Sequence, residues 1–173
     1  TLYFDNIKIE KIGSGAGTGE LQTTNVTFDG NDVLVNNFKG LGVQWDPYVV
    51  HPLTDEEWQT VTKRVDFLNP AFVRCMIYAN TYCEGFDDEG NPIYDFDSLA
   101  NQALIRELDY LESRDIEVVL GEWETLGRFG GEFEGITVDD PRWASIIGGF
   151  LDYLINQQGY TCITYFNYVN EAN

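Results

Sequence analysis

The sequence predicts an α/β fold in which helices cover a parallel sheet. Apolar runs of strand length alternate with segments whose apolar residues recur at helical spacing. Of the 173 residues, 43% are hydrophobic and 14% aromatic, which is enough to build a packed core. Because buried strands that alternate with helices typically form a parallel sheet, we expect this arrangement here. No apolar run approaches the roughly 20 residues needed to span a bilayer.

The N-terminal part differs in pattern from the rest of the chain. Residues 1–12 contain alternating apolar and polar positions, which predict the last strand of a preceding β module. Residues 13–25 begin with four alternating glycines and predict a flexible linker, because no helix follows that could complete a phosphate-binding loop. Residues 26–35 predict a hairpin with its turn at 29–32. The α/β domain is therefore expected to span 26–173.

The first two strands are expected at 40–45 and 72–77, separated by a helix. Thr54 and Glu57 match the capping box that begins a helix. After them, apolar residues recur at the three- and four-residue spacing of one helix face: Trp58, Val61, Val65 and Leu68.

An acidic loop at 87–92 precedes the second half of the predicted domain. The spacing of its oxygen-bearing side chains does not match a calcium-binding EF-hand. A helix at 97–114, a strand at 117–121, a helix beginning at Asp140-Pro141 and a strand at 161–169 complete the order β-α-β-α-β-α-β.

Two architectures share this order, the doubly wound sheet and the (β/α)8 barrel. A doubly wound sheet should carry a glycine fingerprint after its first strand, but residues 45–48 contain no glycine. A barrel takes about 250 residues. We therefore expect the first half of a barrel, its strands 1–4 with an N-terminal β-strand and hairpin extension, and treat the doubly wound sheet as the alternative.

Composition excludes several functional classes. The chain has 29 acidic and 10 basic residues, a net charge of −19, so neither nucleic acid nor an anionic membrane is an expected partner. One histidine, His51, and the absence of any Cys-x-x-Cys spacing argue against a metal site or a cofactor. Cys75 and Cys162 lie in apolar runs and are expected to be core residues. The acidic, lysine-poor composition is compatible with secretion.

Candidate site residues lie where the predicted strands end, because ligands bind at the carboxyl ends of parallel strands. Carboxylates, an arginine, an amide and aromatic rings converge there, and this set is typical of carbohydrate sites. The arginine lies within an apolar strand and is expected to form an ion pair. The candidates are Trp45, Arg74, Tyr78, Glu122, Trp123, Asn170 and Glu171.

Three segments resemble the clan-A retaining glycoside hydrolases. Residues 38–46 resemble their first barrel strand, Phe72-Val73-Arg74 their second, and Asn170-Glu171 the Asn-Glu pair that ends their fourth. The resemblance implies that Glu171 is the general acid/base and that Asn170 binds the sugar 2-hydroxyl. It also implies that Arg74 supports a nucleophilic glutamate on a seventh strand, which this chain does not contain. Ala172 stands where many relatives have proline.

The expected function is therefore hydrolysis of glycosidic bonds with retention, by an enzyme of which this chain forms one part. Trp45, Trp123, Tyr78 and Glu122 are expected to bind the substrate. The expected partners are a carbohydrate and the remaining half of the barrel, in the same or a separate chain. A non-catalytic glycan-binding or assembly protein is the alternative.

Overall fold

The computed structural model describes residues 36–47 and 53–171. The expected strand within 1–12, the linker at 13–25, the hairpin at 26–35 and His51 lie outside these residues. The chain separates into two compact units, residues 1–38 and 39–173. The second unit carries the candidate site.

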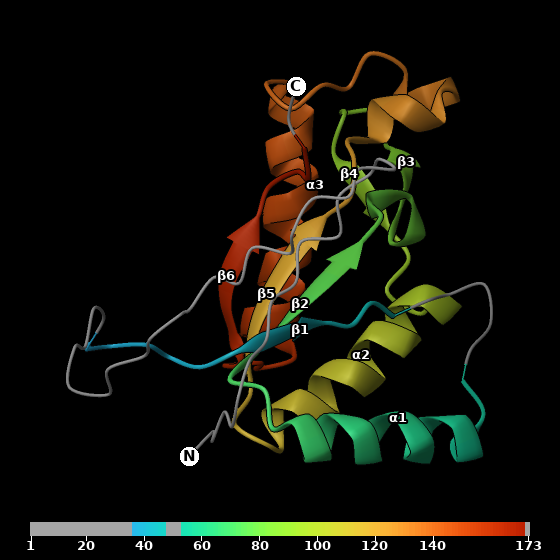
Figure 1. Ribbon diagram of the computed structural model, residues 1–173. Helices are drawn as coiled ribbons and strands as arrows, with labels where there is room; N and C mark the ends of the chain where they lie inside the picture. The colour runs from blue at the N-terminus through green and yellow to red at the C-terminus, as the bar shows by residue number, and fades with distance from the viewer. Residues whose placement is uncertain (1–35, 48–52, 172–173) are drawn as a thin grey trace, which may run out of the picture. The chain divides into compact units, whose positions relative to one another are not determined.

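A parallel four-stranded sheet confirms the predicted α/β class. Its strands are β1 (Gly42–Gln44), β2 (Phe72–Ile77), β5 (Glu117–Glu122) and β6 (Ile163–Asn167), and they lie in the order β1-β2-β5-β6 (Figure 1). Each strand therefore pairs with its neighbour in the predicted succession. The reversal of direction that marks a doubly wound sheet is absent among these four strands. This order is compatible with half of a barrel.

Helix α1 (Asp55–Leu68) begins at the predicted capping box. The backbone N–H of Glu57 donates to Thr54 Oγ1 at 3.3 Å, and the backbone N–H of Thr54 donates to Glu57 Oε2 at 2.9 Å. The helix ends at Asn69, which adopts a left-handed conformation with φ of 46°.

The other two helices lie where the sequence predicts them, and the third begins at its predicted Asp140-Pro141 signal. Ser98 caps α2 (Leu99–Glu112) by accepting a hydrogen bond from the backbone N–H of Asn101. Asp140 caps α3 (Pro141–Asp152), where proline occupies the first turn. A π-helical turn, η4 (Tyr153–Gln157), extends α3.

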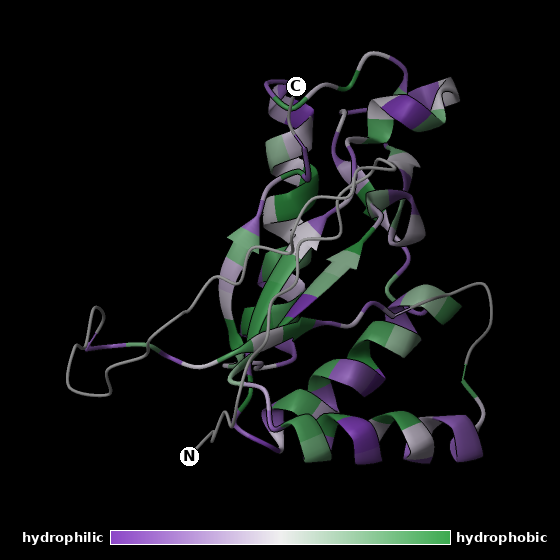
Figure 2. Ribbon diagram, viewed as in Figure 1, coloured by the Kyte–Doolittle hydropathy of each residue, from purple (hydrophilic) through white to green (hydrophobic). Residues whose placement is uncertain are grey.

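The three helices pack on one face of the sheet. Side chains at alternate positions of β2 and β5 form a single core with the apolar faces of α1, α2 and α3. Figure 2 shows the apolar character of these two strands. Right-handed crossovers between strands that pair in sequence order place every helix on the same face. The core contributions of the two strands are Val73, Cys75, Ile77, Val118 and Leu120.

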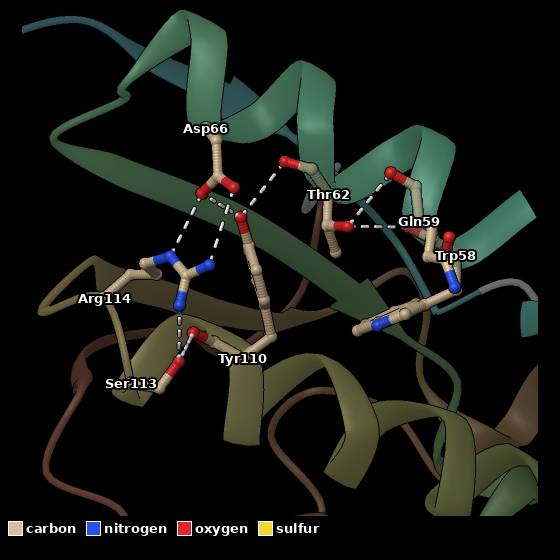
Figure 3. A network of polar contacts seen from close by, with 7 residues as sticks. All are labelled: Trp58, Gln59, Thr62, Asp66, Tyr110, Ser113 and Arg114. Atoms are coloured by element: carbon tan, nitrogen blue, oxygen red, sulfur yellow. Dashed lines mark hydrogen bonds and ion pairs between the residues drawn. The ribbon is translucent and has the colours of Figure 1, made fainter. Parts of the chain in front are cut away.

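Polar contacts fasten α1 to α2 at the outer surface (Figure 3). The Tyr110 hydroxyl lies 2.5 Å from Asp66 Oδ1 and 3.1 Å from the Thr62 carbonyl oxygen. Arg114 Nε donates to the same Asp66 oxygen at 3.0 Å. Hydrogen bonds from Arg114 and Tyr110 hold the pKa of the Asp66 carboxyl below its usual range.

The segment between β2 and α2 contains structure that the sequence analysis assigned only to a loop. A 3₁₀ turn, η1 (Ala79–Thr81), leads into an antiparallel hairpin of β3 (Cys83–Phe86) and β4 (Pro92–Tyr94). Two further 3₁₀ turns, η2 (Leu126–Phe129) and η3 (Gly131–Phe133), follow β5. The hairpin strands are too short to show a period-two pattern, which explains why the pattern alone did not reveal them.

All three cysteines are buried and unpaired. This confirms the expectation that Cys75 and Cys162 are core residues. Burial raises the pKa of the Cys75 thiol well above its ordinary value.

Candidate functional site

The carboxyl ends of the strands are aligned by backbone hydrogen bonds that continue beyond the strands themselves. The N–H of Trp123, one residue past the end of β5, donates to the carbonyl oxygen of Ile77, the last residue of β2, at 2.9 Å. The N–H of Asn170, three residues past the end of β6, donates to the carbonyl oxygen of Glu122, the last residue of β5, at 2.8 Å. These bonds bring residues from separate predicted strand ends to one edge, as the sequence analysis expected.

A chain of polar side chains crosses this edge on the face that the described helices do not cover. Arg74 Nη2 donates to Asn170 Oδ1 at 2.6 Å, and Arg74 Nη1 donates to Gln44 Oε1 at 2.9 Å. Gln44 Nε2 then donates to Asp46 Oδ2 at 2.9 Å, and the Met76 N–H donates to Asp46 Oδ1 at 2.8 Å. We call Asn170, Arg74, Gln44 and Asp46 the polar chain.

Glycine on β5 allows close approach across the strand between β2 and β6. A Cβ atom at Gly121 would lie 2.7 Å from Asn167 Cβ and 3.0 Å from Met76 Sδ. The side chains of Met76 on β2 and Asn167 on β6 therefore both border the space that a β5 side chain would occupy at this level. Because Gly121 has no side chain, no side chain at this position of β5 stands between Arg74 and Asn170.

The surroundings of Arg74 differ from the expected ion pair. Its guanidinium is half-buried and bonds to two amide oxygens, and no carboxylate of the described residues lies within ion-pair distance. Because the uncovered face leaves the guanidinium partly accessible to water, its charge does not require a counterion for solvation. The guanidinium therefore keeps its positive charge, which can attract a substrate or a further carboxylate.

Glu171 follows Asn170 directly and is exposed. Its φ of 50° places a non-glycine residue in the left-handed region, which is a locally strained conformation. None of the residues described bonds to its carboxylate. The structure therefore places Glu171 beside the polar chain as an accessible acid.

Aromatic rings form a wall at the same edge. The Tyr78 ring lies 6.5 Å from the Trp123 ring at an interplanar angle of 28°, and the Phe129 ring meets Tyr78 edge-on at 6.1 Å. The Arg74 guanidinium carbon lies 5.7 Å from the centre of the Trp123 ring, which links the wall to the polar chain. We call Tyr78, Trp123 and Phe129 the aromatic wall.

Trp45 takes a different position. Its ring lies 5.4 Å from Trp58 and 5.9 Å from Tyr110, so it packs with α1 and α2. These contacts describe a packing role on the helix-covered side, away from the aromatic wall.

Glu122 lies in the interior rather than at the accessible edge. Its side chain is 0% exposed, and the Tyr82 hydroxyl donates to its Oε1 at 2.6 Å. Burial raises the pKa of this carboxyl to about 8, and the hydrogen bond from Tyr82 limits the rise. The side chain ends β5 on the helix-covered face, where its hydrogen bond with Tyr82 ties the residue between η1 and β3 to the sheet.

The sequence predicts Asp46 at the end of the first strand but gives it no role. Gln44 of the polar chain and Phe129 of the aromatic wall were not predicted. Gln44 pairs in register with Arg74, and Asp46 lies two residues further on. Residues paired in register on neighbouring strands point to the same face of a sheet, so knowing this pairing would have added Gln44 to the candidate residues. Phe129 lies in η2, an irregular segment that offers no comparable signal.

Other acidic groups near the edge are engaged elsewhere. Glu124 forms an ion pair with Arg128 one helical turn away. Asp87 accepts hydrogen bonds from the backbone and side chain of Asn91 within the turn between β3 and β4. Across 36–47 and 53–171, no group of three or more potential ligands is placed to hold a metal ion. No helix in these segments has the length and apolar character to cross a membrane.

Comparison of the chain with protein families, with curated proteins and with solved structures finds no match.

Proposed function

We propose that this chain forms part of a secreted glycoside hydrolase that cleaves glycosidic bonds with retention. In this proposal the sheet is the first half of a (β/α)8 barrel. Glu171 is the general acid/base, and Asn170 binds the sugar ring beside it. The observation that supports this proposal most strongly is the 2.6 Å hydrogen bond from Arg74 Nη2 to Asn170 Oδ1. It fixes the Asn170 amide next to the exposed carboxyl group of Glu171.

The orientation of the Asn170 amide supports this role. Because its Oδ1 accepts from Arg74, its Nδ2 remains available as a donor. A donor in this position suits a sugar hydroxyl oxygen. Gln44 holds the other arm of the guanidinium, so rotation of Arg74 away from Asn170 breaks a second hydrogen bond.

The proposed reaction has two steps. Glu171 first donates its proton to the glycosidic oxygen, while a second carboxylate attacks the anomeric carbon and the bond to the leaving group breaks. Glu171 then removes a proton from water, which attacks the anomeric carbon and releases the second carboxylate. Retaining hydrolases place the two carboxyl groups about 5–5.5 Å apart.

The second carboxylate belongs to the part of the enzyme that completes the barrel. Among the described acids at this edge, Asp46 is bound within the polar chain, Glu122 is buried and Glu124 is paired with Arg128. Arg74, with an unneutralised charge, is placed to stabilise an incoming carboxylate.

The sheet face that the described helices leave uncovered is evidence for a partner, the other half of the barrel. Tyr165, which pairs with Val119 of β5, is 54% exposed on this side of the sheet, although the faces of a parallel sheet are usually covered. Completing strands, in the same or a separate chain, would cover this face and pair with β1 and β6, the outer strands of the sheet within the described residues.

The direct test is Glu171→Gln in the complete protein, assayed on a panel of 4-methylumbelliferyl glycosides. General acid/base catalysis contributes roughly 10²- to 10⁴-fold, so we expect a loss of this size with an unchanged unfolding midpoint. Glu134→Gln is the matched control, because Glu134 is also an exposed glutamate but lies beside η3. Equal activity of the Glu171→Gln variant and the wild type would refute the assignment.

A non-catalytic glycan-binding protein is the second candidate. It is favoured by the absence of any described carboxylate positioned to act with Glu171. In that case the complete protein binds oligosaccharides without hydrolysing them, and Glu171→Gln changes neither property by more than a few fold.

A further inference from the structure

Asp46 is the buried member of the polar chain. It lies two residues past the end of β1 and is only 5% exposed, whereas Gln44 is exposed. The Met76 N–H of β2 donates to Asp46 Oδ1 at 2.8 Å, which ties the carboxylate to the backbone of the sheet. Because a backbone N–H can only donate, the oxygen bonded to it must remain an acceptor. The second oxygen, Oδ2, therefore faces Gln44 from a fixed position.

Gln44 stands between two groups of opposite hydrogen-bonding character. Its Nε2 donates to Asp46 Oδ2 at 2.9 Å, and its Oε1 accepts from Arg74 Nη1 at 2.9 Å. A carboxylate only accepts hydrogen bonds and a guanidinium only donates them. The Gln44 amide therefore satisfies both neighbours in one orientation. In the reversed orientation two acceptors would face each other on the Asp46 side and two donors on the Arg74 side, and both hydrogen bonds would be lost.

Within the described part of the chain, Asp46 is the fixed point of this arrangement. Gln44 is exposed, so packing does not favour either orientation of its amide. The Arg74 guanidinium does not supply a fixed reference, because among the described residues its hydrogen bonds go to the side chains of Gln44 and Asn170. The Asp46 side chain, in contrast, is buried and bonded to the backbone. The order of donors and acceptors along the polar chain therefore starts at Asp46.

We propose that Asp46 is a positioning residue of the candidate site, where its carboxylate selects the orientation of the Gln44 amide that holds Arg74. The amide stands between the carboxylate and the guanidinium. Asp46 therefore orients Arg74 without direct contact between the two charged groups. This inference rests on the proposed function in that it gives Asp46 a part in the same reaction, through Arg74 and Asn170.

The first test is Asp46→Asn in the complete protein, measured as kcat/KM at neutral pH on an aryl glycoside that the wild type cleaves. The new amide keeps an oxygen for the Met76 N–H and turns its Nδ2 toward Gln44, whose own amide then reverses and presents a donor to Arg74. We expect kcat/KM to fall at least by the roughly three- to tenfold that loss of one hydrogen bond causes. Asp88→Asn, in the exposed turn between β3 and β4, is the matched control and should leave kcat/KM unchanged. Wild-type kcat/KM in Asp46→Asn would overturn the inference.

Exchanging the carboxylate and the amide between the two positions tests the mechanism. Gln44→Glu alone places two carboxylates face to face and should also lower kcat/KM. In the combined Asp46→Asn/Gln44→Glu variant, the new amide donates to the new carboxylate, whose other oxygen accepts from Arg74. The combined variant should therefore have a higher kcat/KM than either single variant, and additive losses would overturn the inference. If Asp46→Asn does not fold, comparison of Gln44→Glu with the combined variant gives the same test.

A background without the guanidinium distinguishes positioning of Arg74 from a general structural role of Asp46. In Arg74→Met protein there is no guanidinium to orient, so adding Asp46→Asn should lower kcat/KM further by less than about twofold. A structural role would give the same loss in the Arg74→Met background as in the wild type. That result would overturn the inference.

Urea unfolding of the same variants separates this inference from the proposed function. The exchange restores the hydrogen bonds whether or not the protein cleaves glycosides, so the combined variant should unfold at a higher urea concentration than either single variant. Hydrolysis with additive effects at positions 44 and 46 overturns the inference and leaves the hydrolase intact. Restored stability in the combined variant, without hydrolysis by any form of the protein, supports the hold of Asp46 on Arg74 and overturns the proposed function.

Discussion

The face of the sheet that the described helices leave uncovered carries a positively charged side chain at each end, and the surroundings of these two side chains differ. At the amino end, Lys39 Nζ lies 3.3 Å from Glu117 Oε1 and within 3.5 Å of the Tyr165 hydroxyl. At the carboxyl end, Arg74 contacts only the amide oxygens of Gln44 and Asn170 among the described residues. One cation is neutralised by an ion pair, and the other is held in place with its charge retained.

This difference indicates what each end does. An ion pair between exposed groups satisfies both charges and leaves nothing for a ligand. Amide oxygens orient a guanidinium without neutralising it, so its field acts on whatever carboxylate or substrate approaches. Sites in parallel α/β folds lie at the carboxyl ends of the strands, where the retained charge is found.

The largest expected effect is on the pH dependence of stability. It comes from the carboxyl group of Glu122, which lies at the carboxyl end of the sheet on the helix-covered face. Glu122 has a pKa raised from 4.5 to about 8 by burial. Between these two values the unfolded chain loses its proton while the folded chain keeps it, so the free energy of unfolding falls as pH rises. At roughly 1.4 kcal/mol per pH unit, the total over this range is on the order of 5 kcal/mol.

Glu122→Gln should remove this dependence, because the amide cannot ionise and its oxygen still accepts from Tyr82. We expect the stability of the variant relative to wild type to increase from pH 4.5 to pH 8 and then level off. Urea unfolding at several pH values measures it, with the exposed Glu134→Gln variant as control. A constant difference across this range would show that the buried carboxyl does not titrate as described.

The next effect tests the carboxyl-end cation itself. Arg74→Lys keeps the charge but loses the planar group that reaches Asn170 and Gln44 together. Loss of hydrogen bonds to a charged group, worth about 1.5–3 kcal/mol, should lower kcat/KM roughly ten- to a hundredfold. Activity equal to wild type would mean that point charge alone suffices and that orientation of Asn170 is unimportant.

Gln44→Leu should have a smaller effect. It removes one of the two acceptors of Arg74 and leaves the bond to Asn170 in place. We expect a roughly three- to tenfold decrease in kcat/KM, corresponding to about 0.5–1.5 kcal/mol for one hydrogen bond. A double-mutant cycle with Arg74→Lys measures the coupling, and additive effects would exclude a shared action through Arg74.

The smallest effect is expected at the amino end. Lys39→Met breaks an exposed ion pair, which contributes little to stability, and lies away from the candidate site. Activity should be unchanged and the unfolding midpoint should move by no more than a few degrees. Loss of activity comparable to that of Arg74→Lys would remove the distinction between the two ends.

Local signals predicted most of the fold. The Thr54–Glu57 capping box, the Asp140-Pro141 start and the buried strand at 72–77 were each found where expected, because such features depend on adjacent residues. Strand order agreed with the alternation of strands and helices. The β3–β4 hairpin was not predicted because its strands are too short to show an alternating pattern in the sequence.

The candidate site was predictable only as a set of strand ends. Asn170, Glu171, Arg74, Tyr78 and Trp123 do lie at one edge. Which face each side chain takes depends on register and on the neighbouring layers. For this reason the interior position of Glu122, the packing of Trp45 and the amide partners of Arg74 required the structure.

The most direct test of the central claim is azide rescue of Glu171→Ala in the complete protein. With an activated aryl glycoside that the wild type cleaves, the first step proceeds without proton donation. Azide, which needs no general base, then attacks the anomeric carbon in place of water. The account predicts faster turnover with azide and, by proton NMR, a glycosyl azide with the anomeric configuration of the substrate. Wild-type turnover without azide, or an azide product of inverted configuration, would contradict it.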